Sequence, residues 1–127
     1  MASSSSINYD WKILGLGRGV STAKQAEENL KALGYKNIKI DGSLENNAGG
    51  DEKLIALLKE NDWDAVSLGG GLTGYDEHFQ REVATLHWFN RIVNIIHEHA
   101  PKAKFIFVDK PESLVEGIHR VLDNGHK

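Results

Sequence analysis

The chain has 127 residues, of which 40% are hydrophobic and 26% are charged, a composition typical of one globular domain. Its formal net charge of −3 argues against a general nucleic-acid binder, because the phosphate backbone selects clustered lysine and arginine. There is no cysteine, which excludes disulfides, thiolate metal sites and thiol nucleophiles and suits a reducing compartment.

No run approaches the roughly 20 apolar residues that span a bilayer. Residues 1–6 lack the charged and apolar regions of a signal peptide and read as a flexible tail. We therefore expect a cytoplasmic protein with no nucleic-acid and no membrane partner.

Four short apolar or alternating runs are each followed by a helical pattern. The predicted strands are residues 11–16, 36–41, 63–68 and 104–109, and the predicted helices begin at Ser21 or Thr22, at Asp51, at Asp76 and at Pro111. The second strand alternates polar and apolar residues, as edge strands do, whereas the fourth is apolar in the manner of a central strand. The longest predicted helix runs from Asp76 to Ala100, where Pro101 ends it.

Strands that alternate with helices predict right-handed crossovers and a parallel sheet covered on both faces. The expected fold is a small three-layer α/β/α sandwich of the flavodoxin-like type, with four parallel strands in the order 2-1-3-4. One domain is expected over residues 7–124, between tails at 1–6 and 125–127.

Two glycine-rich loops follow the first and third predicted strands, which are neighbours in this order. Ligands bind such sheets beyond the carboxyl ends of the strands, where the winding direction reverses. Glycines let a backbone approach a ligand, helix N-termini favour anions, and an arginine can add a forked contact. The alternative is that these glycines only form tight turns. The candidate ligand-binding residues are Gly15, Gly17, Arg18, Gly19, Ser21, Thr22, Gly69, Gly70, Gly71 and Thr73.

The first loop resembles the dinucleotide-binding fingerprint of Rossmann domains, since Gly15, Gly17 and Gly19 alternate with other residues. Asp41 ends the second strand, where the resemblance implies a contact to a ribose. Val20 stands at the position of the third fingerprint glycine, and the chain is too short for a second mononucleotide-binding half. Dinucleotide binding is therefore kept only as an alternative.

Two further resemblances concern the fold. The segment 107–114, with Asp109-Lys110-Pro111, is similar to the lysine–proline segment of response-regulator receiver domains, but glycines occupy the place of the phosphoacceptor aspartate. This resemblance implies an interaction module without phosphotransfer. The span 12–122 resembles a family of short, functionally uncharacterised flavodoxin-like proteins, through Gly15-Leu16-Gly17, the segment 67–71 and the segment 94–101. That resemblance implies the fold and no activity.

Candidate catalytic groups follow the second glycine loop. His78 or Glu77 can serve as a general base and Tyr75 as a donor, although acidic residues also suit a helix N-terminus by charge alone. His97 and His99 lie on different sides of a helix, and no H-E-x-x-H pattern is present, so no metal site is predicted. No cofactor is predicted.

The long predicted helix is apolar over more of its surface than one sheet covers. One stripe is assigned to the core, namely Phe79, Val83, Leu86, Phe89, Val93 and Ile96. An adjacent stripe of Trp88, Ile92 and Ile95 would be an unusual exposed patch and predicts a homodimer through the helix Asp76–Ala100. The alternative is a broad buried face within one monomer.

The leading hypothesis is a protein that binds a small anionic molecule, bearing phosphate or carboxylate, between the two glycine loops. It can be a metal-independent acid–base enzyme in which backbone amides and Arg18 stabilise the anion. The first alternative is a receiver-like interaction module that works through the Trp88 helix face. The second is a nucleotide or dinucleotide binder.

Overall fold

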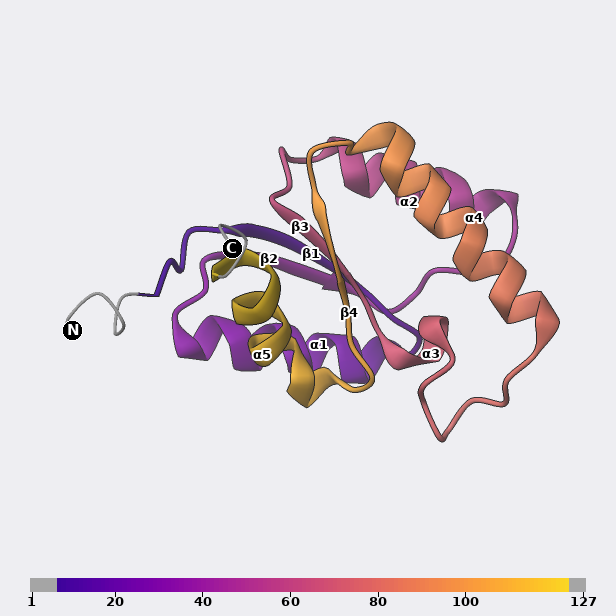
Figure 1. The fold of residues 1–127 in the computed structure, drawn as a ribbon, viewed down its shortest axis with the longest axis horizontal. Helices are drawn as coiled ribbons and strands as arrows, with labels where there is room; N and C mark the ends of the chain where they lie inside the picture. The colour runs from indigo at the N-terminus through magenta and orange to yellow at the C-terminus, as the bar shows by residue number, and fades with distance from the viewer. Residues whose placement is uncertain (1–6, 124–127) are drawn as a thin grey trace.

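The computed structural model describes residues 7–123, which form a four-stranded parallel sheet with helices on both faces (Figure 1). The strands are β1 (Lys12–Leu16), β2 (Asn37–Asp41), β3 (Ala65–Leu68) and β4 (Lys104–Phe107). Their order is β2-β1-β3-β4, so the predicted fold class and strand order are confirmed. The tails expected at 1–6 and 125–127, and the domain end at 124, lie outside the described residues.

Helices α2 and α4 cover one face of the sheet, and α1 and α5 cover the other (Figure 1). The helical elements are α1 (Val20–Leu33), α2 (Ala48–Lys59), α3 (Gly70–Thr73), α4 (Val83–His99), the 3₁₀ turn η2 (Pro111–Ser113), α5 (Leu114–Ile118) and the π-helical turn η3 (His119–Asp123). Within residues 7–123, no helix is both long and apolar enough to cross a membrane.

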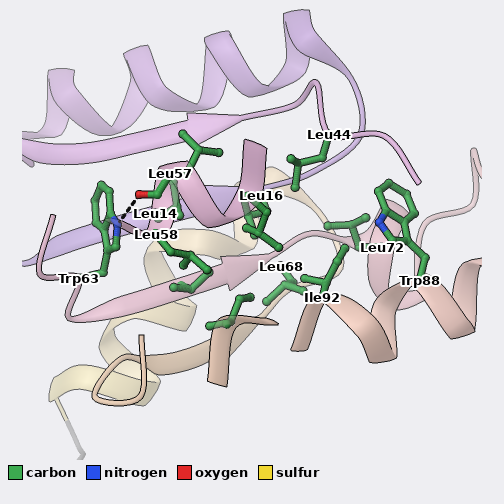
Figure 2. Close-up of a cluster of buried hydrophobic side chains, with 13 residues drawn as sticks. Leu14, Leu16, Leu44, Leu57, Leu58, Trp63, Leu68, Leu72, Trp88 and Ile92 are labelled. Carbon is green, nitrogen blue, oxygen red and sulfur yellow. Dashed lines mark hydrogen bonds between the residues drawn. The ribbon is translucent and has the colours of Figure 1, made fainter. Parts of the chain in front are cut away.

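Alternation along the strands divides the core into two layers. Ile13 of β1 and Ile106 of β4 face α1 and α5, whereas Leu14 of β1 faces α2 and α4. Figure 2 shows the second layer, in which the Trp63 indole N–H donates to the carbonyl oxygen of Leu57 at 3.0 Å. Both faces of the central strands are thus buried, as a parallel sheet requires.

The helix predicted from Asp76 to Ala100 is wrong at its start, because α4 begins at Val83. Gly74 adopts a left-handed conformation at φ 93°, and the Asp76 carboxylate then accepts the backbone N–H of His78 at 2.7 Å. Asp76 therefore holds a local turn, and residues 74–82 form an irregular segment between α3 and α4.

The orientation of α4 also differs from the prediction. Trp88 and Ile92 are only 4% and 1% exposed, and in Figure 2 both point into the core. Val83 and Leu86, assigned to the core, are 67% and 61% exposed. The exposed stripe proposed for a dimer is thus wrong for Trp88 and Ile92, and Ile95 is half-buried against the same core.

The apolar strand β4 is not central. It pairs with β3 on one side only and forms an edge of the sheet, opposite the edge formed by β2. The edge position predicted for β2 is confirmed. The composition of β4 is explained by the α4 side chains packed against it, since the Phe89 and Phe107 rings lie 5.5 Å apart.

Candidate functional site

The loop after β1 is tied to the loop after β2. The amide of Gly17 donates to the carbonyl of Asp41, and the amide of Gly19 donates to that of Gly42, each at 3.0 Å. Gly19 takes a positive φ of 124°, which glycine adopts without strain. Two of the amides expected to hold an anion are therefore already used inside the fold.

Arg18 closes the space between the two glycine loops. Its guanidinium donates to the carbonyl of Gly71 at 3.4 Å and lies over the ring of Phe79, 4.3 Å from the centroid. The centroid of the Trp88 ring lies 5.7 Å from the same guanidinium. No carboxylate of residues 7–123 lies within ion-pair distance of Arg18. Its charge is thus balanced by aromatic faces and a carbonyl dipole.

Two of the predicted glycines serve packing. A Cβ at Gly70 would lie 2.2 Å from the carbonyl oxygen of Asp109, so this position allows α3 to approach the end of β4. A Cβ at Gly15, the residue before the last of β1, would press on the side chain of Ile40 at 3.0 Å. Ser21 and Thr22 are exposed in the first turn of α1.

Asp41 is engaged by its neighbours. Its carboxylate accepts the backbone N–H and the hydroxyl of Ser43, both at 2.8 Å, and lies 3.4 Å from the Lys53 ammonium. Burial by itself would raise the pKa of Asp41, but the Ser43 hydrogen bonds and Lys53 outweigh it and hold the pKa below its usual value. A ribose contact would have to compete with these partners.

A concave surface lies elsewhere, at the carboxyl ends of β3 and β4. Two adjoining cavities of about 410 and 460 Å³ share three wall residues, Thr73, Tyr75 and Phe89. We call the two together the Tyr75 hollow. The α4-side cavity extends from Gly71 along the irregular segment to Leu86, and the β4-side cavity extends over Phe107 to Arg120.

The α4-side cavity carries a cationic group. The Nε of Arg81 donates to the carbonyl of Gly74 at 3.0 Å, and its guanidinium lies 5.4 Å from the centre of the Tyr75 ring. None of the carboxylates in the described part of the chain pairs with Arg81. Thr73 adds a buried hydroxyl that has no hydrogen-bond partner among residues 7–123.

The β4-side cavity is acidic. The hydroxyl of Ser113 donates to the Asp109 carboxylate at 2.8 Å and holds the pKa of Asp109 below its usual value. Glu116 is paired with Arg120 at 2.7 Å, so the net charge of this cavity is that of Asp109. The β4-side cavity thus has a net negative charge, whereas on the α4 side Arg81 and Glu82 both line the wall and their charges balance.

Only one of the three catalytic candidates reaches the hollow. Tyr75 lines both cavities and is 72% exposed. Glu77 and His78 are exposed residues that line neither cavity. Over residues 7–123, no three His, Asp or Glu side chains are grouped so that they could hold a metal ion.

One wall of the hollow is formed by residues that the sequence singled out, and the other wall is not. Thr73 and Gly71, from the second glycine loop, lie where a ligand could reach them. Asp109 and Ser113 were overlooked as site residues, although they follow directly after a strand and so belong at the ligand-binding end of the sheet. A scan of protein-family models gives no match to this chain, and a search of curated proteins also gives none.

Proposed function

We propose that this protein binds a small organic anion with an apolar or aromatic body in the Tyr75 hollow. The observation that carries the proposal is the pair of adjoining cavities that share Thr73, Tyr75 and Phe89. Their volumes fall in the range of small-molecule sites, and they lie at the carboxyl ends of parallel strands. This places the expected ligand one strand further along the sheet than the crevice between the glycine loops.

The wall composition supports an amphipathic ligand. The aromatic rings of Tyr75, Phe89 and Phe107 offer apolar contact. The anionic group belongs on the α4 side, where Arg81 can make a forked contact and, together with Glu82, leaves the cavity neutral rather than negative. It is repelled from the β4 side, where Asp109 is ionised near neutral pH.

The rival functions are less well supported. An interaction module that uses Trp88 lacks its surface, because that side chain is buried. A dinucleotide in the first loop would find the Gly17 and Gly19 amides and the Asp41 carboxylate engaged. Acid–base catalysis by Tyr75 with Glu77 or His78 stays a prediction, and the cytoplasmic location also stays a prediction.

The test is a thermal-shift and calorimetric titration with four probes: benzoate, phenyl phosphate, inorganic phosphate and neutral benzamide. A probe at ten times its Kd adds about 1.4 kcal/mol of stability. For a domain of this size that corresponds to a rise of about 5 °C in Tm. Benzoate and phenyl phosphate are expected to raise Tm more than inorganic phosphate, which lacks an apolar body, and more than benzamide, which lacks charge.

Variants then locate the site. Arg81→Gln is expected to weaken benzoate binding about tenfold while leaving benzamide unaffected, because one charge-assisted contact is lost. Tyr75→Ala is expected to weaken both. Lys36→Gln removes a cation that pairs with Asp10 at 2.8 Å outside the hollow and is the matched control. Unchanged binding in both hollow variants, or no shift with any probe, would overturn the proposal.

A further inference from the structure

Strand β4 leaves one edge of the sheet open. The amides of Lys104 and Val108 donate toward β3, to the carbonyls of Asp64 and Leu68. Since successive residues of a strand alternate, the amide and carbonyl of Phe105 and Phe107 point away from the sheet. Among the described residues, the only hydrogen bond to these outward groups comes from Arg120, which donates to the Phe107 carbonyl at 3.2 Å.

The middle and carboxyl end of this edge lack the features that keep sheet edges apart, although β4 is short and begins with Lys104. Natural edge strands carry inward charges, prolines, bulges or a covering helix. The edge strand β2 has Lys39 at its centre, whereas the sequence of β4 is Lys-Phe-Ile-Phe. Phe107 is 46% exposed and packs on Phe89 of α4, a helix whose outward surface carries the exposed Val83 and Leu86. The unpaired backbone groups of β4 thus lie next to exposed apolar side chains.

The order of residues in β4 is self-complementary. If two copies pair antiparallel about a two-fold axis at Ile106, Phe105 of each lies opposite Phe107 of the other. Both residues have outward amides and carbonyls, so each pair can exchange two hydrogen bonds. Both side chains lie on the α4 face, where cross-strand aromatic pairs are stabilising. The bond from Arg120 does not block this, because a carbonyl oxygen accepts two donors.

Charge at the two ends of β4 favours the same arrangement. Lys102 and Lys104 are exposed at the amino end, and Asp109 and Glu112 are exposed at the carboxyl end, where they outnumber Lys110. None of these five side chains has an ion-pair partner within residues 7–123. Antiparallel pairing sets the lysine end of each strand beside the acidic end of the other, which fixes orientation.

We propose that a second copy of this chain pairs with β4 and extends the sheet to eight strands across a two-fold axis at Ile106. The α4 stripes that contain Val83 and Leu86 then face each other across the axis. Phe107 lines the β4-side cavity, so the second copy also borders the open side of the Tyr75 hollow. This homodimer uses β4 and the outward face of α4, not Trp88.

Sedimentation velocity of the full chain over a concentration series tests the proposal. The wild-type chain is expected to sediment with twice its monomer mass at micromolar concentrations. Phe107→Lys is expected to raise the dimer Kd by roughly tenfold or more, since it puts like charges at the centre of the pairing. Leu33→Lys likewise puts a lysine in place of an exposed apolar side chain, on α1, and is expected to leave the dimer intact.

If Phe107→Lys loses its native circular dichroism, Leu86→Lys on the α4 stripe replaces it, because an exposed helix position tolerates lysine. A wild-type chain that stays monomeric at 100 times those concentrations would overturn the proposal. A dimer that neither variant weakens would overturn it as well.

Discussion

Arg18 shows how a residue suited to anion binding can be used inside the fold. Its guanidinium lies between the two glycine loops, stacked on Phe79 and within 5.7 Å of the Trp88 ring centre. A planar guanidinium stacks on aromatic rings in a way that an ammonium does not. Substitution of Arg18 by lysine can therefore separate its stacking role from its charge.

We expect Arg18→Lys to lower the free energy of unfolding by about 1 kcal/mol, because lysine keeps the charge but loses the stacking on Phe79. Urea denaturation measures the change. Arg81→Lys is the matched control, since Arg81 lies over the exposed ring of Tyr75 and should contribute little to stability. Equal stability of Arg18→Lys and wild type would contradict the structural role.

Asp41 leads to a prediction about pH. Its pKa is lower in the folded protein than in the unfolded chain, so its contribution to stability is fully present above the unfolded pKa of about 3.9. The contribution is lost as the pH falls below that value through the folded pKa. Asp41→Asn is therefore expected to cost about 1 kcal/mol at pH 6 and much less at pH 3.

Urea titrations of wild type and Asp41→Asn at the two pH values test this dependence. Asp10→Asn, at an exposed carboxylate paired with Lys36, is the control for loss of a surface charge. A stability difference for Asp41→Asn that does not change between pH 6 and pH 3 would contradict the account.

At the scale of elements, the sequence prediction and the structure differ at α4. Val83, Leu86, Trp88 and Ile92 all fit an apolar helix, and periodicity cannot say which of two adjacent stripes meets the sheet. The choice is made by contacts distant in sequence, because Trp88 packs with Leu72 of α3 in the core (Figure 2). No local pattern contains that information.

The orientation of α4 predicts contrasting effects of two substitutions. Trp88→Ala is expected to cost about 3–5 kcal/mol, as for other large buried aromatic residues. Leu86→Ala, on the exposed stripe, is expected to change stability by less than about 0.5 kcal/mol. Chemical denaturation at low protein concentration, where assembly does not contribute, measures both. Comparable losses in the two variants would contradict the orientation described here.

For the whole molecule, the sequence was sufficient for the fold and only partly sufficient for the site. Four strands that alternate with helices left few possible topologies, and the order β2-β1-β3-β4 was predicted. The glycine loop after β3 lies at the carboxyl end of the sheet, and its role in ligand binding stays a prediction. The bonds that tie Gly17 and Gly19 to the loop after β2 join segments more than 20 residues apart, so no motif in either loop reveals them.

The central claim is that the ligand site of this protein is the Tyr75 hollow and not the crevice between the glycine loops. Its most direct test is an amide-resolved NMR titration of the ¹⁵N-labelled chain with benzoate. The account predicts saturable shifts at Thr73, Tyr75, Arg81 and Phe89, with residues 17–22 unchanged. Shifts confined to residues 17–22 and 41–43 would place the ligand in the first crevice and contradict it.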